Sequence, residues 1–89
     1  MPSYILKGNG NVKTVEITDS VKIIDSSAFY GCTSLNTVYY SGVASEWNGI
    51  SIGSFNENLT SAPRYYYSET APTVAGNYWH YVDGVPTKW

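Results

Sequence analysis

Charged side chains are scarce in this sequence. Five Lys or Arg and seven Asp or Glu residues make up 13% of the 89 positions and leave a net charge of −2. The usual share of charged residues is roughly 25%. A nucleic-acid-binding surface needs a basic stripe that is missing here, so nucleic acid is excluded as a partner. Solubility must rest on small polar residues and tyrosine hydroxyls, a profile typical of secreted bacterial proteins, and we expect an extracellular or cell-surface protein.

Residues that carry chemistry are equally rare. Cys32 is the single cysteine, which excludes an internal disulfide and the paired cysteines of a metal cluster. His80 is the single histidine, and no nucleophile motif accompanies it. The carboxylates are scattered over different turns. We therefore expect a protein that is not an enzyme, with no catalytic residues, no metal site and no cofactor.

Long apolar runs and a targeting segment are also missing. Apolar stretches last only a few residues, far short of a membrane span, so no membrane insertion is expected. The first residues, Met1 to Tyr4, have neither a basic region nor an apolar region, so we expect no signal peptide in this segment. An exported parent protein would carry its signal elsewhere.

A recurring apolar spacing organises the first two thirds of the chain. The spacing LxxLxL occurs three times, at Val12-Val15-Ile17, at Leu35-Val38-Tyr40 and, in degenerate form, at Ala62-Tyr65-Tyr67. Alternate side chains of a strand face one side. The spacing predicts parallel strands at about 13–17, 37–40 and 64–67. Residues at the same position of each copy would stack in interior columns, which places Tyr65 with Val38 and Tyr67 with Tyr40.

The segment between the first two copies predicts further short elements. Residues 21–24 are mostly β-branched and are bounded by polar turn residues, which indicates a second short strand. Residues 27–31 follow good capping residues and end at Gly31, which predicts one helical turn. Ala28, Phe29 and Cys32 would then face the interior.

These positions together resemble the BspA-like class of leucine-rich repeats, whose coil reads roughly L-x-x-I-x-I-P-x-x-V-x-x-I-G-x-x-A-F-x-x-C-x-x-L. The residues that carry the match are Val12, Val15, Ile17, Val21, Ile24, Ala28, Phe29, Cys32 and Leu35. Asp19 and Asp25 depart from the proline and glycine that are usual there. The run from Tyr40 to Ile50 is similar to the ends of such proteins, and Ser45 is expected to cap a helical turn that begins at Glu46. The resemblance implies stacking on upstream repeats and adhesion at the bacterial surface.

The tail predicts a β-hairpin over 78–82 and 85–89. Asp83-Gly84 lies between aromatic runs, which is the strongest short hairpin signal. A two-residue turn pairs Val82 with Val85, His80 with Thr87 and Tyr78 with Trp89 on one face. The other face then carries Trp79, Tyr81, Pro86 and Lys88.

The expected fold is α+β and mostly β: a short leucine-rich-repeat solenoid with parallel short strands, helical turns and a C-terminal hairpin. One domain spans 1–89, with a repeat coil at about 4–41, an atypical end coil at 42–75 and the hairpin at 76–89. Tyr4 to Leu6 would form a makeshift cover over the first coil.

Aromatic residues reach 16% of the sequence. Most of them would fill the core and the cap. Outward strand positions would line up across the coils on the face that repeat proteins use for binding, namely Thr14, Glu16, Thr37, Tyr39, Arg64 and Tyr66.

Three functional hypotheses stay open at this point. The first is a non-catalytic module for protein–protein interaction or adhesion. The alternative is a cell-wall or carbohydrate-binding module, because the tail is somewhat similar to the aromatic hairpins of choline- and glucan-binding repeats; it would use Trp79, Tyr81 and Lys88. In the third hypothesis the segment only caps a stack whose upstream repeats bind the ligand, a protein or a surface glycan.

Overall fold

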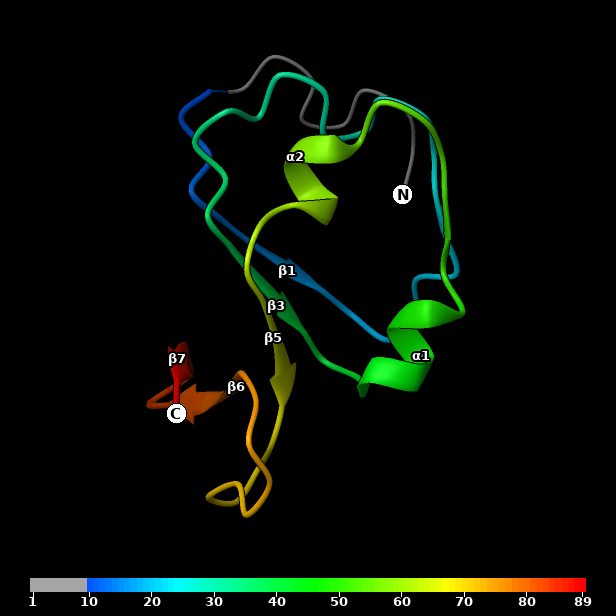
Figure 1. Cartoon of the computed structure of the whole chain (residues 1–89). Coiled ribbons are helices and arrows are strands. Elements are labelled where there is room, and N and C mark those ends of the chain that lie inside the picture. The colour runs from blue at the N-terminus through cyan, green and yellow to red at the C-terminus, as the bar shows by residue number, and fades with distance from the viewer. Residues whose placement is uncertain (1–9) are drawn as a thin grey trace.

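The computed structural model describes residues 10–89 and is built mostly of strands, with two short helices (Figure 1). The predicted cover at residues 4–6 lies outside the described residues. In chain order the elements are β1 (Thr14–Ile17), β2 (Ile23–Ile24), β3 (Thr37–Tyr40), α1 (Ala44–Asn48), β4 (Ser51–Ile52), α2 (Glu57–Thr60), β5 (Arg64–Tyr67), β6 (Tyr78–Val82) and β7 (Val85–Lys88).

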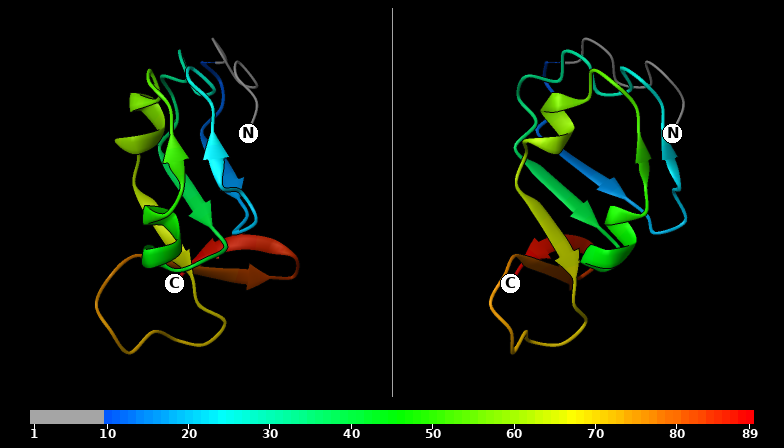
Figure 2. Two further views of the ribbon diagram at one scale, coloured as in Figure 1. Left: turned by 90° about the vertical axis from the view of Figure 1, so that its right-hand side faces the viewer. Right: turned by 45° about the vertical axis from the view of Figure 1, so that its right-hand side comes forward.

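Two sheets face each other across the core. The larger sheet has the order β1-β3-β5-β6-β7, and the smaller one pairs β2 with β4. Figure 2 shows β1, β3 and β5 on one side and β2 and β4 on the other, joined by turns and the two helices. The chain therefore coils around an interior of apolar side chains, among them the fully buried Ile24, Phe29 and Leu59.

The parallel strands are confirmed, and the first two lie in the predicted register. Val15 pairs with Val38 and Ile17 with Tyr40. All four side chains are buried, because every second residue of each strand faces the core.

The register of β5 was predicted wrongly by one residue. Val38 lies opposite Arg64, and Tyr40 lies opposite Tyr66. Because side chains alternate along a strand, this shift turns Arg64 and Tyr66 toward the core side and Tyr65 outward, together with Tyr67. The cause lies just before the strand: the backbone N–H of Ala62 bonds to the carbonyl of Leu59, so this buried alanine completes the turn after α2.

The segment from 25 to 32 forms successive tight turns where a helical turn was predicted. Hydrogen bonds run from Ala28 N–H to Asp25, from Tyr30 to Ser27 and from Cys32 to Phe29, each spanning three residues. The φ angle of Ser27 is +63°, which interrupts any right-handed helix. The prediction that Ala28, Phe29 and Cys32 face the interior is confirmed, since all three are fully buried.

A buried asparagine ties the two long turns together. The Oδ1 atom of Asn56 accepts the N–H of Phe29 at 2.9 Å, and its Nδ2 donates to the carbonyls of Asp25 and Gly53 at 3.0 Å each. Only 3% of Asn56 is exposed. The side chain thus satisfies backbone groups that would otherwise be buried without partners.

Helix α1 begins earlier than predicted. It starts at Ala44 after Val43, so Ser45 lies inside the helix and does not cap it. The carboxylate of Glu46 accepts the N–H of Val43 at 3.0 Å and so satisfies a backbone donor at the helix start. Trp47 is 4% exposed and packs edge-on against Tyr40, with ring centroids 5.2 Å apart.

The C-terminal hairpin is confirmed, including its side-chain pairs. Strand β6 pairs with β7 in antiparallel fashion, with Val82 opposite Val85 and His80 opposite Thr87. Asp83 and Gly84 have φ angles of +51° and +79°, as a type I′ turn requires. Strand β6 also continues the parallel sheet for two residues beside β5. Figure 2 shows the hairpin leaving β5 at a steep angle and lying across the sheet.

Candidate binding surfaces

The six outward residues predicted to form one binding face do not share a face. Thr14 and Glu16 on β1 are exposed, and Tyr39 on β3 is half-buried. Thr37 is 3% exposed and therefore offers almost no surface. Arg64 and Tyr66 point to the opposite side because of the register of β5.

Arg64 and Tyr66 are used inside the fold. Arg64 donates from Nε to the hydroxyl of Tyr66 at 2.9 Å, and its guanidinium carbon lies 4.5 Å from the centre of a Trp47 ring. The ring of Tyr66 meets that of Tyr40 edge-on. A cation over an aromatic face is stabilising, so Arg64 and Tyr66 contribute to the packing around Trp47 and Tyr40.

The hairpin covers the part of the sheet around Tyr39. Trp79 is fully buried, and its ring lies 5.2 Å from Tyr39, 5.2 Å from Tyr67 and 5.0 Å from Tyr81. The indole N–H donates to the carbonyl of Tyr40 at 2.7 Å. The part of the predicted binding face around Tyr39 is therefore covered by the chain's own aromatic residues, while Thr14 and Glu16 stay exposed.

The alternative set, Trp79, Tyr81 and Lys88, lies on one hairpin face as predicted, but this face is turned onto the sheet. The Tyr81 hydroxyl donates to the carboxylate of Glu16 on β1. This hydrogen bond, with burial second, raises the pKa of Tyr81 above its ordinary value. The ammonium of Lys88 lies 4.8 Å from the centre of the Tyr65 ring.

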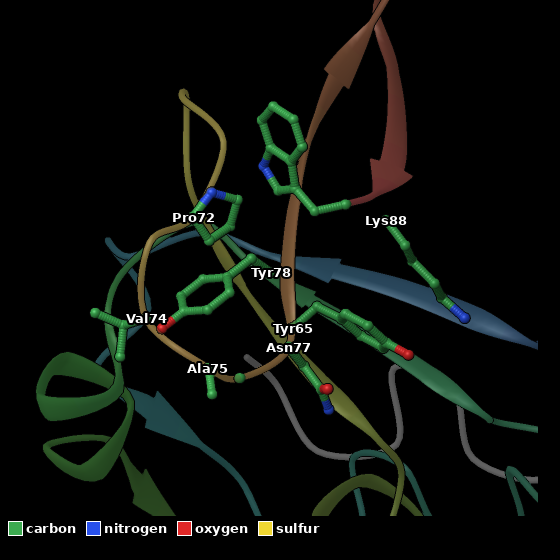
Figure 3. Close-up of a pocket in the computed structure, with 9 residues that line it drawn as sticks. Tyr65, Pro72, Val74, Ala75, Asn77, Tyr78 and Lys88 are labelled. Atoms are coloured by element: carbon green, nitrogen blue, oxygen red, sulfur yellow. The ribbon is translucent and has the colours of Figure 1, made fainter.

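An open pocket of about 460 Å³ lies between the hairpin and the loop that precedes it (Figure 3). Its walls come from β5, from the loop and from both hairpin strands. The lining residues are Tyr65, Pro72, Val74, Ala75, Gly76, Asn77, Tyr78, Lys88 and Trp89. Sequence reasoning missed this pocket, because proline and glycine in 72–76 indicated only a loop, and the pairing of β6 with β5 brings the loop to the hairpin.

Trp89 is fixed in place although 47% of it is exposed. Its indole N–H donates to the carbonyl of Ser68 at 2.7 Å. The His80 ring stacks on it with centroids 3.7 Å apart and planes 12° from parallel. An aromatic ring that is both exposed and fixed can meet a ligand with little loss of conformational freedom.

A second exposed aromatic site lies on the turns at the other end of the coil. Tyr30 is 51% and Phe55 60% exposed, and their rings meet edge-on at 6.5 Å. The φ angle of Phe55 is +63°, the same value as that of Ser27 in the preceding turn. A left-handed conformation costs roughly 1–2 kcal/mol for a residue with a side chain.

Residues with catalytic or ligating chemistry stay apart. In the described part of the chain, no three His, Cys, Asp or Glu side chains are grouped closely enough to hold a metal ion. Cys32 is fully buried. Burial raises the pKa of Tyr40, with Glu46 and Asp19 adding to the effect.

No helix within residues 10–89 is both long and apolar enough to cross a bilayer. Comparison with models of protein families, with curated proteins and with solved structures gave no match.

Proposed function

We propose that this chain is the closing segment of a leucine-rich-repeat solenoid similar to the BspA-like class, and that it serves as a non-catalytic module for protein–protein interaction or adhesion at the bacterial surface. Parallel strands from successive coils support the solenoid. So does the second parallel ladder between β2 and β4, which repeats the arrangement on the opposite side of the core.

The two ends of this stack differ. Within residues 10–89, β1 pairs only with β3 and β2 only with β4, so both are edge strands. Edge strands present backbone donors and acceptors that another strand can use. At the other end, β6 follows β5 for two residues and then turns away into the hairpin. We propose that an upstream coil stacks on the β1 and β2 edge, while the hairpin closes the far end.

Tyr30 and Phe55 carry the interaction role. The chain holds Phe55 in a strained backbone conformation while most of its ring faces solvent, and Tyr30 supports it from the neighbouring coil. The left-handed turn itself recurs at Ser27 in the preceding coil, but the turn does not require a large aromatic ring, and strained residues that carry side chains gather at functional sites. Aromatic residues are also enriched at the centres of protein interfaces.

The packing of the histidine and cysteine side chains supports the non-catalytic part of the proposal. The His80 ring is stacked against Trp89, and Cys32 is fully buried in the core. Both positions favour packing over chemistry. The scarcity of charged residues supports an extracellular or cell-surface location.

The interaction role is tested by biolayer interferometry of the purified chain against immobilised extracellular-matrix proteins and intact bacterial cells. We expect measurable binding to at least one of these surfaces. The double variant Tyr30→Ser/Phe55→Ser should weaken that binding at least about tenfold, the scale of aromatic anchors at interfaces.

A matched control removes exposed apolar surface elsewhere. Val43 and Val85 are 53% and 60% exposed and line neither the aromatic pair nor the pocket, so Val43→Ser/Val85→Ser changes a similar kind of surface at other places. Circular dichroism must first show that both variants keep the fold. Equal loss of binding in the control, or no binding of the parent chain to any of the surfaces, would contradict the interaction role.

A further inference from the structure

We infer that Arg64 is a docking point for a carboxylate of a protein partner, either an acidic side chain or a chain terminus. The site shares no residue with the Tyr30 and Phe55 surface. Binding at one of the two surfaces can therefore fail without affecting the other.

The guanidinium of Arg64 is held in place by two aromatic side chains. Its Cζ atom lies 4.5 Å from the centre of a Trp47 ring and 5.8 Å from the centre of the Tyr66 ring. Its Nε atom donates to the Tyr66 hydroxyl at 2.9 Å. Trp47 is itself buried and packs edge-on against Tyr40, so the base of this stack is part of the core. A group that is fixed in this way loses little conformational freedom when it binds.

Arg64 has no acidic partner within residues 10–89. The bond to Tyr66 is the one hydrogen bond that its side chain makes there. The sequence contains seven Asp and Glu residues, but none of the described carboxylates pairs with this half-buried cation. Charged side chains that leave water are ordinarily paired. The charge of Arg64 is therefore open to a group from outside the fold.

The terminal nitrogens of Arg64 can be reached from solvent. In the described part of the chain, the buried side-chain polar atom without a partner is the Tyr40 hydroxyl. The two Nη atoms of Arg64 also make no hydrogen bond to the described residues, so they would share that status if they were buried. Their N–H groups form a planar fork that matches the two oxygens of a carboxylate.

The Tyr66 hydroxyl supplies a further donor beside this fork. Its oxygen accepts the hydrogen bond from Arg64, and its own hydrogen has no acceptor among the described residues. A phenolic hydroxyl accepts and donates at the same time. A carboxylate at the fork can therefore accept hydrogen bonds from both side chains.

The surroundings of Arg64 favour a carboxylate over a phosphate. The two side chains that contact the guanidinium are uncharged, and Arg64 is the only arginine of the sequence. Phosphate sites commonly add backbone N–H groups or further cations. Glu46, next to Trp47 in the sequence, brings negative charge close enough to help raise the pKa of Tyr40. It repels a doubly charged ligand more than a singly charged one.

A protein partner is the source of carboxylate that the shape of the site favours. Arg64 lines neither the pocket of Figure 3 nor the smaller one that shares Tyr78 with it. Small molecules bind in cavities that bury most of their surface. A carboxylate that projects from a protein needs no such cavity, because the rest of the partner contacts the surrounding surface.

The test is a pair of NMR titrations at low salt with N-acetyl-glycyl-glutamyl-glycine amide and its glutaminyl analogue, which differ only in the carboxylate. The Nε–Hε resonance of Arg64 is an unambiguous reporter, because the sequence has no other arginine. We expect the glutamyl peptide to bind weakly but about fivefold more tightly than the analogue, the scale of one exposed charge pair. This preference should disappear in about 1 M salt.

Arg64→Lys keeps the charge and removes the planar fork, so the preference should fall to about twofold or less. The indole N–H resonance of Trp47 follows binding in this variant. Tyr66→Phe removes the hydroxyl and keeps the ring, and it should lower the preference at least about twofold, the scale of one hydrogen bond. It replaces Arg64→Lys if circular dichroism shows that the lysine variant has a disturbed fold. Lys13→Gln, which removes an exposed cation just before β1, should keep the full preference.

A third titration uses N-acetyl-triglycine, whose carboxylate is a chain terminus, and so separates the two sources on a protein. Binding of either carboxylate peptide with dependence on Arg64 supports the assignment and identifies the source. The assignment is overturned if neither carboxylate peptide binds more tightly than the glutaminyl analogue, or if Arg64→Lys and Tyr66→Phe both keep the full preference. Tighter binding of methyl β-D-glucuronide than of either peptide would also overturn it, because the partner would then be an acidic glycan.

Discussion

Trp79 should be the residue on which the position of the hairpin depends most. Its side chain is fully buried, contacts the rings of Tyr39, Tyr67 and Tyr81, and donates to the carbonyl of Tyr40. Truncation of a buried tryptophan to alanine costs roughly 3–5 kcal/mol. The lost hydrogen bond adds about 1 kcal/mol, because the Tyr40 carbonyl is left without this donor. The total stability expected for 89 residues is only roughly 4–13 kcal/mol.

Urea unfolding followed by far-ultraviolet circular dichroism measures the effect. We expect Trp79→Ala to lower the free energy of unfolding by about 4 kcal/mol or more. Trp79→Phe keeps an aromatic ring and loses the N–H, so about 1–2 kcal/mol should be lost. Trp89→Ala is the matched control, because this tryptophan is 47% exposed and should cost far less. A loss below about 1 kcal/mol for Trp79→Ala, or equal losses at both tryptophans, would refute the packing of the hairpin on the sheet.

Three further outcomes are expected. Phe29→Ala removes a fully buried ring and should cost roughly 3–5 kcal/mol, so a melting temperature that moves by only a degree or two would show that Phe29 is outside the core. Asn56→Ala leaves the Phe29 N–H and the carbonyls of Asp25 and Gly53 without their partner, and in thermal melts it should cost about 3 kcal/mol, more than an exposed Asn→Ala change. Tyr40→Phe removes a buried hydroxyl that has no hydrogen-bond partner within residues 10–89, so at neutral pH it should be neutral or stabilising by up to about 1 kcal/mol. Burial raises the pKa of Tyr40, so the folded state favours the neutral hydroxyl, and this contribution to stability is lost as the pH rises from about 10 through the folded pKa. Urea unfolding at pH 8 to 11 should therefore show that the free energy of unfolding falls less steeply with pH in Tyr40→Phe than in the parent chain. The same pH dependence in both would contradict this.

Local patterns in the sequence were sufficient for the individual strands and the turn of the hairpin. Val15 and Ile17 alternate with polar neighbours, so their inward direction follows from the geometry of a strand alone. Asp83-Gly84 specifies a type I′ turn, and the pairs of the hairpin follow from its two-residue length. The burial of Ala28, Phe29 and Cys32 was expected from a predicted helical turn, and it is observed although successive tight turns stand in place of that helical turn.

The binding surface was less predictable, because it depends on how distant segments meet. Three consecutive tyrosines, Tyr65 to Tyr67, give no alternation of apolar and polar residues, so the sequence leaves open which of them face inward. The turn after α2 decides this by placing Ala62 in the core and shifting β5 by one residue. For this reason Arg64 and Tyr66 do not lie on the expected sheet face, and the hairpin covers Tyr39. Of the alternative set, Trp79 is buried against the sheet, while Tyr81 and Lys88 stay exposed.

By itself, then, the sequence determined the parallel strands, the inward residues of the first two of them and the hairpin with its two faces. Each of these depends on chain geometry over a few residues. Only the tertiary structure decided that the hairpin face with Trp79 lies against the sheet. It also decided that the end of β7, at Lys88 and Trp89, lines a pocket together with residues 72–77 of the loop. The physical reason is that β6 pairs with β5 for only two residues before it turns away. That exit direction results from packing between Trp79 and residues far away in the sequence, which no local pattern records.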